Sequence, residues 1–119
     1  MAPHERLQAW KASHEVVLAI YGATASWPRH ELYGLTAQAR RAAFSIAANI
    51  AEGAAKRGAR EFRRFLDIAL GSHAELCYVL QLARDIGLVP PEEWERLEEL
   101  RSASGKLTWR LYQAIQRAG

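Results

Sequence analysis

The sequence predicts an all-α protein that folds as an antiparallel up-down-up-down four-helix bundle. Apolar residues recur at steps of three and four through four segments, and glycine or proline separates each segment from the next. Ala, Leu, Arg and Glu are common, and no stretch alternates apolar and polar residues for long. Short connections favour antiparallel neighbours. With 119 residues, the chain is expected to form one domain over residues 1–119.

The first helix is expected over about residues 5–24, and the second over about residues 34–52. The first ends near Trp27, because a residue that precedes proline avoids the helical region. Its predicted inward seam consists of Leu7, Trp10, His14, Val17 and Tyr21. Gly53 follows the second helix and is expected to be its C-terminal cap.

The second helix is apolar on almost every side. Its inward seam is predicted to be Leu35, Ala39, Ala42, Ile46 and Asn49, while Ala37, Phe44, Ala48 and Ala51 lie opposite. A helix with apolar residues all round is usually buried on both faces. Because a four-helix monomer would leave one of these faces in water, the pattern predicts contact with another subunit.

The third helix, expected over about residues 60–85, has a similar excess of apolar residues. Its inward seam is predicted to be Phe62, Leu66, Ala69, His73, Leu76 and Leu80, and its outer face carries Ile68, Gly71, Tyr78 and Leu82. A mid-helix glycine costs about 1 kcal/mol relative to alanine, so we expect Gly71 to permit close packing against another backbone. The fourth helix, at about residues 91–116, opens with Pro91 and Glu92, which both suit a helix start.

Positive charge near the start of the third helix is the main functional signal. The basic residues between Gly34 and Glu75 are Arg40, Arg41, Lys56, Arg57, Arg60, Arg63 and Arg64. Cations oppose the dipole of a helix N-terminus, whereas a phosphate is favoured there. Arginine also suits bidentate phosphate contact. The cluster therefore predicts a negatively charged partner, although an ordinary solvated surface is the alternative. No exposed aromatic residues are interleaved with the cluster, so we expect mainly salt-dependent backbone contact.

The formal net charge is +3, and its distribution is uneven. Residues 56–64 carry five basic side chains and one acidic, whereas residues 85–99 carry six acidic side chains and one basic. We expect these two segments to lie at opposite ends of the bundle or to meet across subunits.

No catalytic or metal-binding motif is present, so we expect no enzymatic activity, no metal and no cofactor. The four histidines are scattered, and none forms a Glu-x-x-His pair.

Asn49 and Glu52 are expected to close the second helix or to orient the basic loop after it. Glu75 is a candidate partner for Arg40 or Arg41. A single cysteine fits a reducing cytoplasm, and no apolar run approaches the ~18 residues of a membrane span.

Several blocks of the sequence carry a family resemblance. They include Trp27-Pro28 followed by Glu31-Leu32-Tyr33-Gly34-Leu35-Thr36, then Asn49-Ile50-Ala51-Glu52-Gly53, and Ala69-Leu70-Gly71-Ser72 with Glu75. The chain resembles the four-helix-bundle proteins encoded in intervening sequences of bacterial 23S ribosomal RNA genes. The accessory variability proteins of diversity-generating retroelements are similar to the same group. One departure is Gly58-Ala59, where family members often place a serine near the start of the third helix.

The resemblance implies a ring-like homopentamer with a basic surface. In the retroelement branch, that surface would contact a reverse transcriptase and nucleic acid. The predicted function is therefore a cytoplasmic, non-enzymatic, oligomeric bundle that binds RNA, or RNA and DNA, through backbone phosphates. The alternative is a protein-interaction adaptor that docks a reverse transcriptase or another acidic partner.

Overall fold

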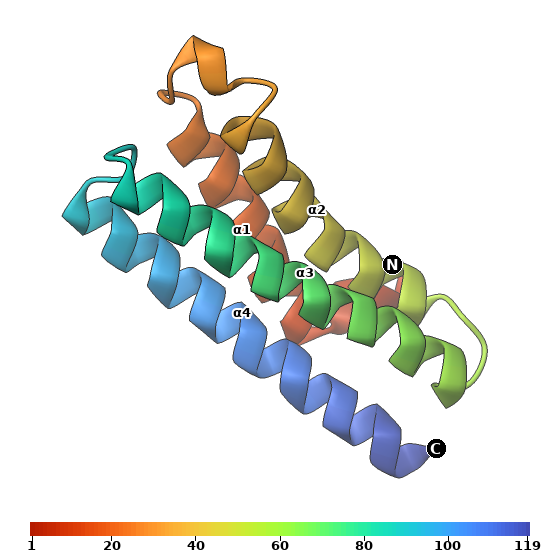
Figure 1. Cartoon of the computed structure of the whole chain (residues 1–119). Coiled ribbons are helices and arrows are strands. Elements are labelled where there is room, and N and C mark those ends of the chain that lie inside the picture. Colours follow the sequence, from red (N-terminus) through yellow and green to blue (C-terminus); the bar gives the residue numbers. More distant parts are fainter.

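The computed structural model describes all 119 residues and consists of four long helices in an antiparallel bundle (Figure 1). The helices are α1 (Gln8–Thr24), α2 (Leu35–Ala54), α3 (Ala59–Asp85) and α4 (Pro91–Ala118), with short 3-10 turns η1 (Pro3–Arg6) and η2 (Arg29–Glu31). Each helix packs against the helices before and after it, and α4 closes the bundle against α1. The predicted all-α four-helix fold is confirmed.

The core runs along the axis of the bundle, and α2 and α3 share its most extensive helix contact. Fully buried aliphatic side chains come mainly from Ile20 of α1, Ile46 and Ile50 of α2, and Leu66, Leu76 and Leu80 of α3. Three alanines of α2, Ala39, Ala42 and Ala43, are also completely buried. Small side chains at a helix contact shorten the distance between the axes, which explains the close fit of α2 and α3.

The predicted core seam of α1 is wrong by one position. The buried residues of this helix include Ala9, Ser13, Val16 and Ile20, whereas the predicted seam members His14 and Tyr21 are exposed. A shift of one residue turns the seam by 100°. The sequence does not reveal this seam, because its members include a serine and several alanines. The larger apolar residues Leu7, Trp10 and Val17 suggest a different inward face. Those three residues pack at the margin of the core.

Gly53 is not the C-terminal cap of α2, because the helix continues through it to Ala54. The glycine is buried, and a Cβ atom at this position would lie 2.8 Å from Phe65 Cβ and 3.0 Å from Phe62 Cδ1. Its role is therefore to let α2 and α3 approach each other. The positive φ in the α2–α3 connection belongs instead to Gly58, at φ +88°, which directly precedes α3 and provides no side-chain cap.

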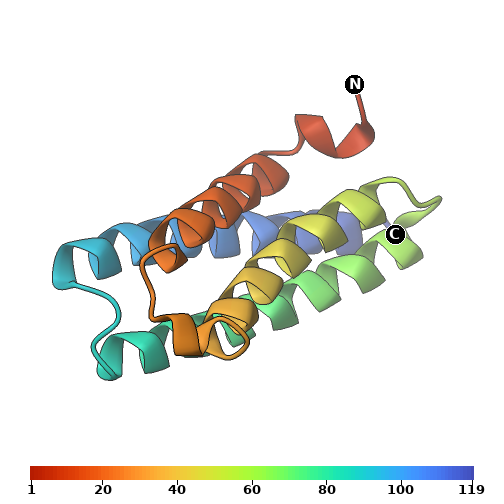
Figure 2. The same ribbon diagram turned by 90° about the horizontal axis from the view of Figure 1, so that it is seen from above.

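The two charged segments lie at opposite ends of the subunit. The α2–α3 loop shares its end with both chain termini, while the α1–α2 and α3–α4 loops share the other end (Figure 2). The 27 residues of α3 separate the two ends by about 40 Å. The basic segment therefore cannot neutralise the acidic one within a single chain.

None of the helices has an apolar stretch that could span a lipid bilayer.

Candidate nucleic-acid interface

Five cations gather at the α2–α3 end of the bundle. This basic end cluster consists of Lys56 and Arg57 in the loop, and Arg60, Arg63 and Arg64 on the first turns of α3. Only Arg64 has a carboxylate partner: its Nε lies 3.1 Å from Glu61 Oε2. The hydrogen bond from Arg64 lowers the pKa of Glu61. The other four cations make no ion pair within the chain, so most of the charge is available to a partner.

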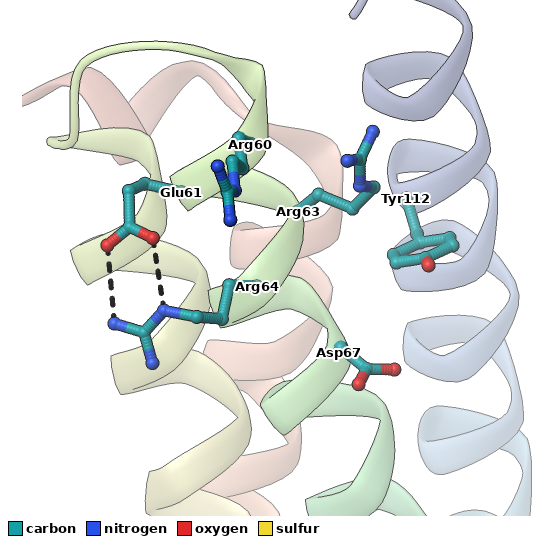
Figure 3. Close-up of a pocket in the computed structure, with 6 residues that line it drawn as sticks. All are labelled: Arg60, Glu61, Arg63, Arg64, Asp67 and Tyr112. Carbon is teal, nitrogen blue, oxygen red and sulfur yellow. Dashed lines mark hydrogen bonds and ion pairs between the residues drawn. The ribbon is translucent and has the colours of Figure 1, made fainter.

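Part of the basic end cluster borders an open hollow of about 560 Å³ between α3 and α4. This arginine hollow is lined by Arg60, Glu61, Arg63, Arg64, Asp67 and Tyr112. Figure 3 shows Arg63 extending toward α4 and Tyr112, while Arg64 turns the other way to meet Glu61. Asp67 lies farther along α3 and makes no ion pair. The hollow is thus cationic toward the start of α3 and carries a free carboxylate toward its middle.

Phe65 anchors two of the cations. The Arg64 guanidinium lies 4.6 Å from the centroid of the Phe65 ring, and Lys56 Nζ lies 5.4 Å from it. The ring itself is buried. Cation–π attraction to the Phe65 ring therefore helps to hold Lys56 of the loop and Arg64 of α3 close together.

Arg40 and Arg41 do not belong to this cluster, which corrects the prediction of one basic surface. Sixteen helical positions separate Arg40 from Lys56, a distance of about 24 Å along α2. Arg40 Nε donates to Thr24 Oγ1 at 2.9 Å, and its guanidinium lies 4.7 Å from the Tyr21 ring centroid. These contacts tie α2 to α1. Arg41 is exposed, and neither arginine pairs with Glu75.

Asn49 does not close α2, because its side chain binds Ser45 one turn back along the same helix. Its Nδ2 donates to the Ser45 carbonyl at 2.7 Å and to Ser45 Oγ at 3.0 Å. Ser45 Oγ is in turn 2.7 Å from Ser72 Oγ on α3. The predicted capping role of Asn49 is therefore wrong, and Ser72 belongs to this polar bridge between α2 and α3. Glu52 is exposed and has no ion-pair partner, although its carbonyl accepts a hydrogen bond from the Ala55 amide.

A second polar network lies in the core, and the sequence revealed only its histidine. His73 Nε2 is 3.2 Å from Ser104 Oγ and 3.3 Å from Thr108 Oγ1, and Ser104 Oγ is 2.8 Å from Ser13 Oγ. Desolvation, with a smaller effect of Arg101, lowers the pKa of His73 to about 4. Ser104 is fully buried, and His73 Nδ1 has no hydrogen-bond partner. The imidazole has no acidic partner in this network, and none of its members lines a pocket.

The comparisons with known proteins agree with this architecture. Residues 5–109 match the profile of the 23S rRNA-intervening sequence protein family. The chain belongs to this family. A crystal structure of a protein with unknown function from the S23 ribosomal protein family of Bacteroides thetaiotaomicron superposes with a TM-score of 0.80 and 23% sequence identity. The match covers 88% of this chain and 95% of the other, and it shows a shared fold. No curated protein matches the sequence.

In this family member, the outer face of α2 and α3 exposes large apolar side chains. Phe44 is 60% exposed and Tyr78 is 64% exposed, and Ile68 and Leu82 are also exposed. The predicted interface residues Ala37, Ala48 and Ala51 are half-buried. A Cβ atom on Gly71 would meet nothing within 4 Å. The close packing predicted at Gly71 is therefore absent within one subunit.

Proposed function

We propose that this family member is a non-enzymatic, oligomeric helical bundle that binds nucleic acid through backbone phosphates at the basic end cluster. The observation that carries the proposal is that Lys56, Arg57, Arg60 and Arg63 have no carboxylate partner in the chain. Charge-assisted contact with phosphate would satisfy these cations. The amides at the start of α3, which no side chain caps, would add to the attraction.

A homo-oligomer, pentameric and ring-like by resemblance, forms part of the same proposal. Exposed apolar patches commonly mark interfaces, and α2 and α3 expose the large apolar side chains Phe44, Ile68, Tyr78 and Leu82. Several copies of the basic end cluster on one particle would convert weak contacts into useful avidity. The single cysteine, Cys77, is free, and we propose that the assembly works in the reducing cytoplasm.

The proposal is tested by titrating a labelled, structured RNA with wild-type protein and with the triple variant Arg60→Ala, Arg63→Ala, Arg64→Ala. We expect wild-type binding at low salt and a loss of about tenfold or more in the triple variant, because three phosphate contacts disappear. Arg41→Ala is the matched control, since it removes an exposed arginine far from the cluster. Absence of wild-type binding at low salt, or equal affinity of all three proteins, would contradict the proposal.

The unpaired cations of the basic end cluster also suit a second candidate, an adaptor that docks an acidic protein such as a reverse transcriptase. Affinity capture with a purified reverse transcriptase, using wild type and the triple arginine variant, separates the two candidates. Arginine-dependent capture in the absence of RNA binding favours the adaptor.

A further inference from the structure

Two aromatic rings stack on α4, and one of them, that of Tyr112, lines the arginine hollow. The rings of Trp109 and Tyr112 are nearly parallel, with an interplanar angle of 10° and centroids 5.6 Å apart. Tyr112 is one of the residues that line the hollow, and Trp109 is 49% exposed. The fold therefore brings an accessible aromatic surface to cations that precede it by about fifty positions in the sequence.

Other exposed aromatic side chains lie elsewhere. Tyr33 belongs to the loop at the opposite end of the bundle, and Tyr78 lies on the outer α2–α3 face. Phe62 and Phe65, which are close to the cluster in sequence, pack toward the core. Tyr112 lies on the side of the hollow toward which Arg63 extends (Figure 3), and Trp109 stacks on Tyr112.

We propose that the arginine hollow binds an unpaired nucleotide, with its phosphates on Arg60 and Arg63 and its base against the Trp109–Tyr112 stack. This inference rests on the proposed nucleic-acid binding. Proteins that bind single strands combine a cationic track with aromatic side chains on which bases stack. A paired base is already covered on both faces by its neighbours, so the same surface offers a duplex only the phosphate contacts.

Asp67 makes the two ends of the hollow differ in charge. Its carboxylate lines the hollow without an ion-pair partner, and it would repel a phosphate placed beside it. A carboxylate can instead accept a hydrogen bond from the exocyclic amino group of a base. The arrangement therefore directs phosphates toward Arg60, at the start of α3, and the base toward Asp67 and Tyr112.

The test compares a labelled single-stranded RNA of about 16 nucleotides with the same strand hybridised to its complement and with a strand that lacks its bases. At one salt concentration, wild type is expected to prefer the intact single strand to both other probes. Trp109→Ala is expected to weaken single-strand binding by roughly 5- to 100-fold, the loss of stacking on one base. Binding of the duplex and of the base-free strand should stay within about twofold, since their phosphate contacts remain.

Two further variants separate stacking from a structural effect. Trp109→Phe retains an aromatic face and should recover most of the single-strand preference, while Tyr33→Ala, which removes a 93% exposed aromatic side chain, should change nothing. Equal losses on all probes, or equal wild-type affinity for single strand and duplex, would overturn the inference and leave phosphate binding intact. Failure of wild type to bind any of the probes would instead overturn the proposed function itself.

Discussion

His73 shows how strongly one side chain depends on its surroundings. The imidazole is 6% exposed and lies among the hydroxyl groups of Ser104 and Thr108, and burial lowers its pKa from 6.5 to about 4. The native state therefore holds His73 neutral at pH values where the unfolded chain binds a proton. Stability is expected to be complete above about pH 6.5 and to fall as the pH decreases toward 4, because the unfolded state then binds more protons.

This dependence can be measured by urea unfolding at about pH 7.5 and about pH 5. Wild type is expected to lose about 2 kcal/mol of unfolding free energy through His73 over this range. His73→Gln should be less stable at the higher pH, since the polar network is disturbed, but it should lose correspondingly less on acidification. An identical pH dependence in the two proteins would show that His73 does not titrate as its burial requires.

The polar residues around His73 could be predicted from the sequence only in part. The sequence pattern predicts His73 on the core seam, and the residue is buried there, because large neighbours such as Leu76 and Leu80 define the helical period around it. Ser13, Ser104 and Thr108 complete its network from two other helices. Local polarity predicts exposure for such residues, so only the packing of the bundle could reveal that they are buried together.

Among the helices, α2 and α3 show how a missing side chain determines packing. Gly53→Ala places a methyl group within 2.8 Å of Phe65 Cβ. We expect it to destabilise the protein by about 1–3 kcal/mol, the usual cost of overpacking. Gly22→Ala is the matched control, because a Cβ atom on Gly22 meets nothing within 4 Å, and it should stabilise α1 by up to about 1 kcal/mol. Denaturant unfolding measures both values, and a Gly53→Ala protein as stable as the wild type would contradict the close contact between α2 and α3.

The helices themselves were largely predictable, because glycine and proline mark most of their ends. Gly58 and Gly87 adopt positive φ at the two ends of α3, and Pro91 begins α4 as expected. The errors arose where a local pattern has two structural uses. Gly53 followed a predicted helix and suggested a cap, yet its lack of a side chain serves the contact with α3.

The candidate site was predictable only in part. Lys56 to Arg64 form one cluster because they are close in sequence at a helix start, whereas Arg40 and Arg41 lie on α2, about 24 Å from Lys56 along the helix axis. The position of Tyr112 beside the arginines depends on α3 and α4 being antiparallel neighbours. A contact of this kind is a property of the assembled bundle and has no local signature.

For the whole molecule, Phe44 tests the proposed assembly. Phe44→Glu introduces a charge into the exposed apolar face of α2 and α3, and we expect it to dissociate the oligomer because an unpaired charge cannot be buried there. Light scattering gives the particle mass, and circular dichroism should show that helicity is retained, since Phe44 lies outside the core. Tyr33→Glu, in a loop, should leave the mass unchanged. A monomeric wild-type protein would contradict the assembly.

Phosphate binding by the basic end cluster is tested most directly by the salt dependence of RNA affinity, measured for the wild type and for the variant that lacks Arg60, Arg63 and Arg64. Each phosphate contact contributes about 0.7 to 0.9 to the slope of log K against log salt concentration. We expect a steep negative slope for the wild type and a slope shallower by about two or more for the variant. Equal slopes for the two proteins would show that the basic end cluster does not contact phosphate.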